Sequence, residues 1–379
     1  MTRASKKIEA PVTEVEVSVA EPEVQLKEAQ GSIGGRRLLL GIVGNDAKNE
    51  ETRQFLTPEA CGLLTSSGIE IMMETEAGID LSFTDEMYSE YGVKIVTRAE
   101  ALQAPLVLSF LPLPVKDVKK MKPDSAVLCT MSSALFDEQL IKVLLEKKIT
   151  LGVLDNMYNH RDMPVFADII DEINGRAAIM YAQEALSFLG EGKGVLLGAV
   201  GGINPCEVLI IGSGLEVEAA ATAAMATGAL VTLMDNDVSS LLEARRHCSD
   251  RLLTAMIHPK VLYNKVKTAD VIILGNCSRP FEMPRNLLMT LKDSVYMLDL
   301  GKVEPSVSVP RTVAMALSNV LVNFFNEMLI KDGLMPMIAS NAGIRAGIVT
   351  FRGHMVDKLV GSYTGHPAVD LNVLLTGTN

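Results

Sequence analysis

The sequence predicts an α/β protein whose parallel sheets are covered by helices on both faces. Short apolar runs of strand length alternate with helical patterns along most of the chain, and this alternation is typical of parallel strands joined by helices. Hydrophobic residues make up 48% of the 379 residues and charged residues 21%, which is a globular composition. The length is sufficient for two domains, each with its own core.

The first half of the chain carries a series of expected strands separated by helices and loops. We expect strands at 36–45, 68–75, 93–96, 105–111, 125–131 and 149–156, and helices at 84–91 and 136–147. Between the first two strands, a loop leads into a helix in which Pro58 stands at the first turn, behind Thr57. The pattern over 164–189 predicts a long helix, which is a candidate for a rod linking two lobes.

A second series of strands and helices begins at Val208. The segment 192–205 before it is expected to be a hairpin or a loop. We expect strands at 208–212, 230–235, 270–276 and 294–301. The last segment, 310–379, has no strand series of its own, so we expect it to be mostly helical and to pack back on existing elements.

The beginning of the chain and its charge exclude several classes of partner. Residues 1–35 alternate Glu, Val and Pro and lack the apolar core of a secretory signal, so we expect a disordered acidic tail. The net charge of −11 disfavours nucleic acid and anionic membranes. The longest apolar runs are interrupted and too short to span a bilayer, so no membrane span is expected.

The cysteines indicate a reducing compartment. The chain has five, an odd number, and none forms a C-x-x-C pair; they are Cys61, Cys129, Cys206, Cys248 and Cys277. This usage argues against a disulfide framework and against a zinc site. We therefore expect a cytoplasmic protein that holds no metal.

The stretch VLIIGSGLEVEAAATAAMATGALVTLMDND, from Val208 to Asp237, predicts a dinucleotide-binding Rossmann turn. Gly212 lets the chain turn sharply after a buried strand, and Gly214 lets the backbone approach a pyrophosphate. The amides at the start of the next helix would bind that phosphate. Asp235 ends the following strand about 20 residues on, where a carboxylate binds the ribose diol and favours NAD over NADP.

Two departures from the fingerprint leave a second interpretation open. The third glycine position is Val217, whose larger side chain would push the helix away from the strand. Glu216 and Glu218 lie in the first helical turn, where the helix dipole stabilises carboxylates without any ligand. The alternative is therefore a structural Rossmann domain whose anion site is plugged.

Several stretches together resemble the family of alanine dehydrogenases and proton-translocating transhydrogenase alpha subunits. NEETRQFLTPEAC resembles the family's N-terminal motif, and DEINGRAAIMYAQEALSFL with GKGVLLGAVGGINPCEVLIIGSG resembles its inter-lobe helix and the run into the Rossmann turn. ADVIILGNCSRPFEMPRNLLMTLKDSVYMLDLG and VPRTVAMALSN resemble its later Rossmann strands and its return segment. The similarity spans about 36–329.

The resemblance implies a Rossmann NAD-binding domain inserted in a second, flavodoxin-like α/β substrate domain. We expect the substrate domain at 36–160 plus 313–379 and the NAD domain at 161–312. The implied activity is NAD-dependent oxidoreduction of the alanine dehydrogenase type, the reversible oxidative deamination of L-alanine to pyruvate and ammonia. The implied assembly is a homo-oligomer, either a hexamer or a dimer.

The resemblance also assigns site residues. Arg53 matches the position that binds the substrate carboxylate, which suits a bidentate cation. Asp299, at the end of SVYMLD, matches an active-site aspartate near the nicotinamide. The expected cofactor-binding residues are Gly212, Ser213, Gly214, Leu215, Asp235, Asn276, Cys277 and Leu298.

Two positions depart from the family's proton relay and keep alternatives open. Ser109 stands where the substrate-binding lysine is expected, and Ser132 stands where the catalytic histidine is expected. One alternative is an NAD(H)-binding subunit like the transhydrogenase alpha subunits, whose hydride acceptor is a second nucleotide. The other is a family member without catalytic activity that acts as a binding module.

Overall fold

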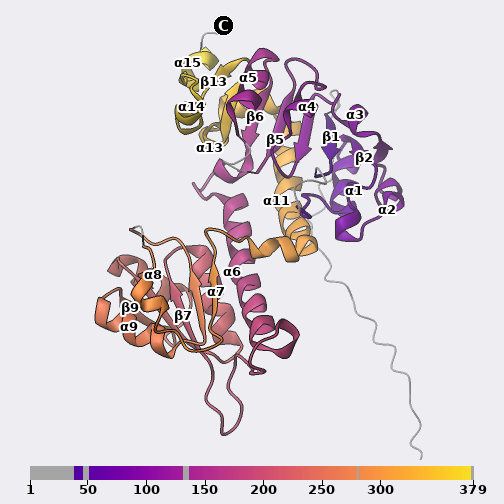
Figure 1. Cartoon of the computed structure of the whole chain (residues 1–379). Coiled ribbons are helices and arrows are strands. Elements are labelled where there is room, and N and C mark those ends of the chain that lie inside the picture. Colours follow the sequence, from indigo (N-terminus) through magenta and orange to yellow (C-terminus); the bar gives the residue numbers. More distant parts are fainter. Residues whose placement is uncertain (1–37, 46–50, 131–135, 280, 377–379) are drawn as a thin grey trace, which may run out of the picture.

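The computed structural model describes residues 38–45, 51–130, 136–279 and 281–376. The expected acidic tail at 1–35 and Ser132 lie outside the described residues. Within the described residues, the strands form two sheets, one of eight strands and one of five. Nearly all strand pairs in them are parallel, and helices connect the strands, which confirms the α/β class (Figure 1).

The eight-stranded sheet combines the N-terminal and C-terminal parts of the chain. Its order is β13-β12-β6-β5-β4-β1-β2-β3. The strands are β1 (Leu39–Val43), β2 (Glu70–Glu74), β3 (Lys94–Val96), β4 (Leu106–Ser109), β5 (Ala126–Cys129), β6 (Thr150–Val153), β12 (Ile348–Phe351) and β13 (His354–Met355). The last two strands were not expected from the sequence, and β12 pairs antiparallel with both β6 and β13.

The five-stranded sheet is entirely parallel and has the order β11-β10-β7-β8-β9. Its strands are β7 (Glu207–Ile211), β8 (Leu230–Asp235), β9 (Leu253–Met256), β10 (Val271–Leu274) and β11 (Tyr296–Asp299). Only β9 was not expected. The strands β8 and β9 extend the sheet on one side of β7, and β10 and β11 extend it on the other, so the strand order switches between β7 and β10. Open α/β sheets bind their ligands at the carboxyl ends of the strands beside such a switch point.

Several helices begin at a residue whose side chain caps the first turn. In the first of them, Thr57 Oγ1 accepts from Ala60 N at 3.3 Å, and Pro58 occupies the first helical position. The helices are α1 (Pro58–Ser66), α2 (Asp85–Glu90), α3 (Arg98–Ala101), α4 (Val115–Val118), α5 (Glu138–Glu146), α6 (Val165–Leu186), α7 (Leu215–Ala226), α8 (Val238–His247), α9 (Pro259–Thr268), α10 (Arg285–Leu288), α11 (Pro310–Ile330), α12 (Leu334–Ser340), α13 (Ala342–Ala346), α14 (Lys358–Thr364) and α15 (Leu371–Thr376). Short 3₁₀ helices are η1 (Ile79–Leu81), η3 (Leu154–Asn156), η4 (Phe188–Gly190) and η5 (Pro305–Ser308).

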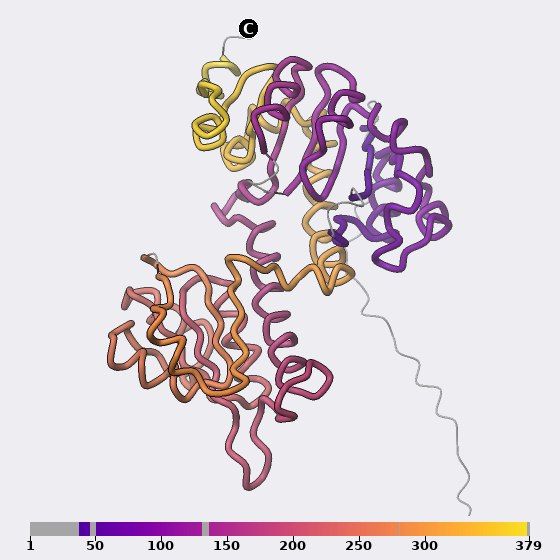
Figure 2. Tube along the Cα trace, viewed as in Figure 1, coloured from indigo at the N-terminus to yellow at the C-terminus, as the bar shows by residue number. Residues whose placement is uncertain are grey.

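Two long helices connect the lobes that contain the two sheets. Figure 2 shows α6 running from the first lobe into the second, and α11 carrying the chain back. The strand orders support our proposal that 36–160 and 313–379 form one domain and 161–312 the other. By length and composition α11 alone among the described helices could cross a membrane, but half of its most apolar window is buried inside the protein, as in the core helix of a globular lobe.

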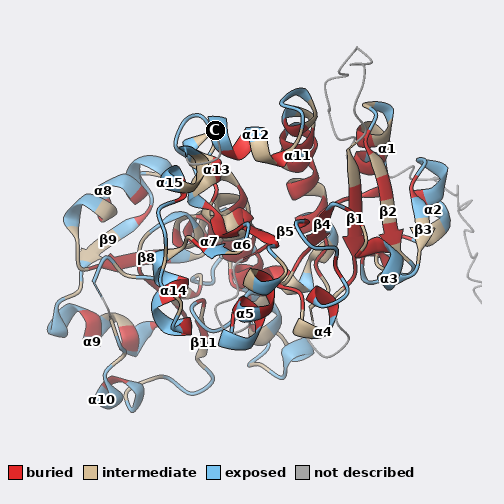
Figure 3. Ribbon diagram, turned by 90° about the horizontal axis from the view of Figure 1, so that it is seen from above, coloured by how far each residue is buried: buried red, intermediate tan, exposed pale blue. Residues whose placement is uncertain are grey.

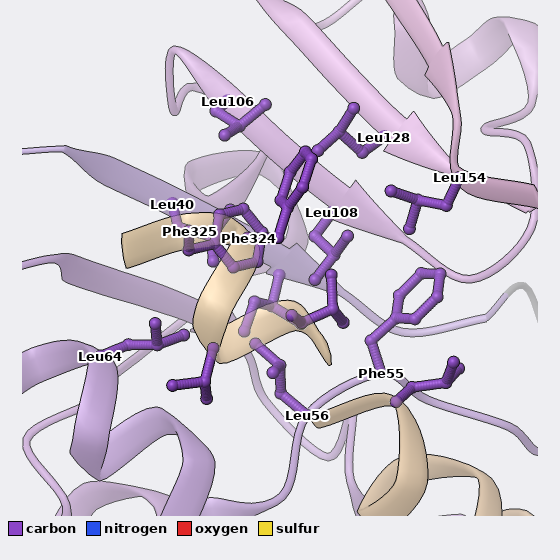
Figure 4. Close-up of a cluster of buried hydrophobic side chains, with 14 of the residues drawn as sticks. Leu40, Phe55, Leu56, Leu64, Leu106, Leu108, Leu128, Leu154, Phe324 and Phe325 are labelled. Carbon is purple, nitrogen blue, oxygen red and sulfur yellow. The ribbon is translucent and has the colours of Figure 1, made fainter. Parts of the chain in front are cut away.

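The helix α11 completes the core of the eight-stranded sheet. Figure 3 shows buried residues along α11 and along β1, β2 and β4. Figure 4 shows Phe324 and Phe325 of α11 in one buried cluster with Leu40 and Leu106 of the sheet, and Phe325 and Leu40 are fully buried. Because this core joins residues from both ends of the chain, the lobe needs its C-terminal part to bury the sheet.

The segment that carries Arg53 is fixed between the sheet and α11. The ring of Phe55 lies 4.9 Å from that of Phe110, and Thr57 N donates to Ser318 Oγ of α11 at 3.0 Å. Thr52 Oγ1 donates to the Val307 carbonyl at 2.8 Å. These contacts place the segment at the mouth between the two lobes.

Candidate active site

A cavity of about 510 Å³ lies where the carboxyl ends of strands from both sheets meet. This volume is in the range of small-molecule sites, roughly 300–1,000 Å³. Its lining comes from the segment after β1, from the loops after β4, β5, β6, β10 and β11, from α6 and from the start of α7. The lining residues are Glu51, Arg53, Phe110, Leu111, Thr130, Asp155, Ile170, Asp171, Asn174, Glu216, Asn276, Leu300, Glu304 and Val307. The strand ends of both lobes thus contribute to one site, as in other open α/β sheets.

Arg53 lies on the wall of this cavity, and the protein's own groups already contact its guanidinium. Its Nε donates to Glu51 Oε1 at 2.8 Å, and its Nη2 donates to Glu51 Oε2 at 2.6 Å. The same Nη2 lies 2.6 Å from Glu304 Oε2, and Nη1 donates to Ser306 Oγ at 2.8 Å. The cation also stands over the Phe110 ring, 4.7 Å from the centroid.

The two carboxylates that contact Arg53 differ in their exposure to solvent. The Glu51 side chain is 7% exposed, whereas that of Glu304 is 56% exposed. Burial lowers the pKa of Arg53, but hydrogen bonds and charge from Glu51 and Glu304 outweigh it and leave that pKa above its ordinary value. Glu51 therefore orients a permanent cation, while the more exposed Glu304 contacts its Nη2.

The glycine turn after β7 has the open geometry that a close backbone approach requires. Gly212 and Gly214 have φ of +137° and +97°. A Cβ on Gly212 would lie 2.8 Å from the Asn276 carbonyl oxygen, whereas a Cβ on Gly214 would meet no atom within 4 Å. No side chain caps the start of α7, so its first amides keep their hydrogen-bonding capacity for a ligand.

Val217, at the third glycine position, is accommodated instead of displacing α7. It is fully buried, and its Cγ2 would lie 2.4 Å from a Cβ built on Gly275, just after β10. The missing Cβ of Gly275 thus provides the space for the valine. The carboxylate of Glu218 lies 3.0 Å from His247 Nδ1 of α8, whereas Glu216 faces Asn174 of α6, with which it lines the cavity. Each glutamate therefore faces a neighbouring helix.

Asp235 lies beneath a group of serine hydroxyls at the end of β8. It is fully buried, and its two oxygens accept from Asp237 N at 2.8 Å and from Ser278 N at 3.2 Å. Ser278 Oγ lies 3.2 Å from Ser213 Oγ and 3.0 Å from Ser240 Oγ. The loop after β10 is thereby linked both to the glycine turn and to the start of α8.

Asp299 ends β11 beside the cavity but is not part of its lining. Its Oδ2 lies 2.6 Å from Lys302 Nζ, and its Oδ1 accepts from Gly301 N at 3.1 Å. The neighbouring Leu300 lines the cavity. The aspartate is therefore held by its own loop, and its role near a nicotinamide stays a prediction.

The other expected cofactor residues lie around the same strand ends. Asn276 lines the cavity, and its carbonyl accepts from Ser213 N at 2.8 Å. Burial, and then the charge of Asp235, raise the pKa of Cys277 to about 11, so its thiol stays protonated near neutral pH. Leu298 is 5% exposed and belongs to the core of the sheet. These roles also stay predictions.

Carboxyl groups dominate the remaining wall of the cavity. Burial, and then the charges of Asp171 and Glu304, raise the pKa of Glu216 to about 7, while the hydrogen bond with Asn174 opposes the rise. Burial and then the charges of Asp168 and Glu304 raise the pKa of Asp171 above its usual range. In the described part of the chain, no group of three or more His, Cys, Asp or Glu side chains is arranged to hold a metal ion.

Comparison with known families decides which family the chain resembles. The family described as alanine dehydrogenase/PNT matches through its N-terminal domain at residues 42–169 and through its C-terminal domain at residues 178–278. Together the two matches cover more than half of the chain.

The chain belongs to the alanine dehydrogenase/PNT family.

Individual relatives agree with this assignment over most of their length. The alanine dehydrogenase of Bacillus subtilis strain 168 is 26% identical over 368 residues, covering 88% of this chain and 96% of the relative. That of Staphylococcus haemolyticus strain JCSC1435 is 24% identical over 359 residues, covering 85% and 95%.

Solved structures of the family share the fold. An L-alanine dehydrogenase superposes with a TM-score of 0.76 at 21% identity, covering 86% of this chain and 98% of that one. A transhydrogenase from Sinorhizobium meliloti has a TM-score of 0.67 at 17% identity, with coverage of 85% and 99%. At these identities the superpositions establish the fold alone.

The family resemblance led to Arg53 but not to the polar residues that surround it. Asp171 and Asn174 lie one turn apart on α6 and both line the cavity, and Glu304 contacts Arg53 directly. The first two lie in DEINGRAAIMYAQEALSFL, which resembles the family's inter-lobe helix, but the resemblance assigned them no role in the site. Ser109, at the expected lysine position, is 3% exposed and absent from the lining formed by the described residues.

Proposed function

We propose that the protein is an NAD-dependent oxidoreductase of the alanine dehydrogenase type, which interconverts L-alanine with pyruvate and ammonia. The observation that carries this proposal is a single cavity lined by Arg53 and by the start of the helix that follows the glycine turn. Membership of the alanine dehydrogenase/PNT family supports the same chemistry.

The glycine turn fits the pyrophosphate of a dinucleotide. The space beside Gly214 is open and α7 starts without a side-chain cap, so backbone amides can bind an anion there. The ribose diol would bind at the end of β8, where hydroxyls of Ser213, Ser240 and Ser278 gather near Asp235. When bound, NAD supplies the hydride acceptor.

Arg53 would hold the carboxylate of the amino or oxo acid. Glu51 fixes the guanidinium plane through two hydrogen bonds, so the cation is oriented before the substrate arrives. Glu304 is largely exposed, and the substrate carboxylate would displace it from Nη2. Glu304 is therefore an internal competitor for the same edge of the arginine.

A coupled assay tests this function directly. We expect NADH to form when the purified protein receives NAD⁺ and L-alanine, and to be consumed with pyruvate plus ammonia. D-Alanine and omission of ammonia are the controls. Arg53→Lys keeps the charge but loses the bidentate fork, so it should raise the KM for pyruvate. Absence of any alanine-dependent NADH signal would contradict the proposal.

The saturated state of Arg53 favours a second candidate. A guanidinium already held by Glu51, Glu304 and Ser306 can act as a structural link between the lobes. The chain would then be an NAD(H)-binding subunit or a binding module without catalytic activity. NADH binding without any response to alanine or pyruvate would favour this candidate.

The assembly and compartment complete the proposal. We propose a cytoplasmic homo-oligomer, either a dimer or a hexamer. Light scattering of the purified protein measures the assembly, and a monomeric mass would contradict it.

A further inference from the structure

Carboxyl groups are the proton carriers available in the described wall of the cavity. Among its described lining residues there is no histidine, lysine, tyrosine or cysteine. Glu51 and Glu304 are engaged with Arg53. The other carboxyl groups of the described lining are Asp155, Asp171 and Glu216, and Ser109 replaces the lysine that the family resemblance implies.

Glu216 is the carboxyl group that the helix after the glycine turn contributes to the cavity. It lies two residues after Gly214, in the first turn of α7, and it lines the cavity with Asp171 and Asn174 of α6, which it faces. Arg53 lies on the wall that the segment after β1 contributes. A substrate held by its carboxylate on Arg53 would thus have Glu216 on the cofactor side of the cavity.

We propose that Glu216 is the acid–base group of this site, positioned by Asn174 of α6. The inference rests on the proposed function. In the oxidative direction the Glu216 carboxylate takes a proton from the substrate ammonium group. The N–H bond breaks, an O–H bond forms, and nitrogen keeps the electron pair that it needs to form the C=N bond. In the reverse direction the Glu216 carboxyl returns that proton to nitrogen.

Hydrogen bonds link Arg53 to Asn174, which lines the cavity together with Glu216. Arg53 Nη1 donates to Ser306 Oγ at 2.8 Å, and Ser306 N donates to Asn174 Oδ1 at 2.9 Å. With its oxygen used in this way, the Asn174 side chain has its amide group to offer the Glu216 carboxyl that it faces. Asn174 is 5% exposed, so its side chain is fixed between Ser306 and the cavity wall that carries Glu216.

The charges that face Glu216 adapt it to proton transfer near neutral pH. Asp171 faces it from α6, and Glu304 faces it from the loop after β11. Burial and these two carboxylates raise its pKa to about 7, where a group can both accept and donate a proton. Arg53, which is paired with Glu51, influences the charge at Glu216 through its ion pair with Glu304. Asp168 influences it through Asp171, whose pKa it raises. The acids titrate as a coupled set.

The chain offers a matched control for a test of Glu216. Glu218 lies in the same helical turn, but its carboxylate pairs with His247 outside the cavity lining. We compare Glu216→Gln with Glu218→Gln, and expect NADH affinity to change by less than about twofold in both, since each side chain faces a neighbouring helix.

For L-alanine oxidation, we expect Glu216→Gln to lower kcat about 100- to 10,000-fold with little change in KM, and to remove the pH-rate limb near neutrality. Glu218→Gln should keep the wild-type kcat and the pH–rate limb near neutrality. In carbon-13 spectra of protein labelled at its glutamate side chains, a carboxyl resonance that titrates near pH 7 should vanish in Glu216→Gln alone. Asn174→Ala should move that titration and lower kcat, whereas a purely structural residue would not move it.

The outcomes separate this inference from the proposed function. An active wild type with an equally active Glu216→Gln variant overturns the role of Glu216 and leaves the function standing. An inactive wild type that binds no NADH overturns the function, and the inference with it. A Glu216 carboxyl that titrates in the ordinary glutamate range overturns the inference whatever the activity.

Discussion

Replacement of Gly275 by alanine tests how the protein accommodates a valine at the third glycine position. A Cβ at residue 275 would lie 2.4 Å from Val217 Cγ2, and its next contacts are Ile211 O at 3.8 Å and Val217 Cβ at 3.9 Å. The clash therefore comes from one methyl group. Gly275 has no positive φ, so the backbone itself tolerates alanine.

The magnitude follows from this geometry. An added methyl in a packed core costs about 1–3 kcal/mol, and Gly275→Ala should destabilise the protein by that amount. Val217→Ala alone should cost about 1–2.5 kcal/mol because it empties a buried site. In the double variant the new Cβ meets only atoms at 3.8 Å or beyond, so the clash disappears. We expect a favourable coupling of about 1–3 kcal/mol between the two positions.

Urea unfolding of the four proteins measures the coupling. The chain has no tryptophan, so far-UV circular dichroism follows the transition. The free energies of unfolding are compared among variants whose transitions have the same dependence on urea concentration (the m-value). This condition is needed because the two lobes need not unfold together. Additive losses in the double variant would refute the idea that Gly275 provides the space for Val217.

Three further perturbations give separate results. Gly175→Ala places a Cβ 2.1 Å from the backbone oxygen of Glu216, so α6 and α7 must separate. We expect the free energy of unfolding in urea to fall by about 2–4 kcal/mol. The control Gly201→Ala should lose none, because no atom lies within 4 Å of its added Cβ. Glu304→Gln removes the carboxylate that competes for Arg53. An exposed ion pair contributes about 0.2–1 kcal/mol, so the KM for pyruvate should fall about 1.5- to 5-fold. An unchanged KM would contradict the competition. Because the pKa of Glu216 is raised from 4.5 to about 7 on folding, its stability contribution is present below pH 4.5 and is lost as the pH rises through about 7. After allowance for solvent screening the loss should be about 1–2 kcal/mol, and Glu216→Gln, but not Glu218→Gln, should abolish it in unfolding curves measured across that pH window.

Local patterns predicted the elements whose signals lie within one stretch of sequence. The strand, glycine turn and helix around Gly212 were found because spacing and residue type act over a few residues. The strands β9, β12 and β13 were not expected. Each is short, and β12 exists because its backbone extends an edge of the first sheet beside β6, a partner about 200 residues earlier in the chain.

In the candidate site, too, a motif identified some residues, while only the fold brings the others near them. Arg53 was identified from a motif, but its partner Glu304 lies about 250 residues away and carries no motif of its own. Val217 and Glu216 suggested a blocked anion site because the sequence does not show which way a side chain points. Gly275 provides space for Val217, and Asn174 faces Glu216 in the cavity lining; both come from other elements that only the fold brings near α7.

Titration of the protein with NADH tests the central claim most directly. The absence of tryptophan leaves the fluorescence of NADH itself as a clean signal. We predict saturable binding in the micromolar range, weaker binding of NADPH, and loss of binding in Gly214→Val, since a β-branched residue is strained at a φ of +97°. Failure of NADH to bind up to millimolar concentration would contradict the assignment of the glycine turn as a dinucleotide site.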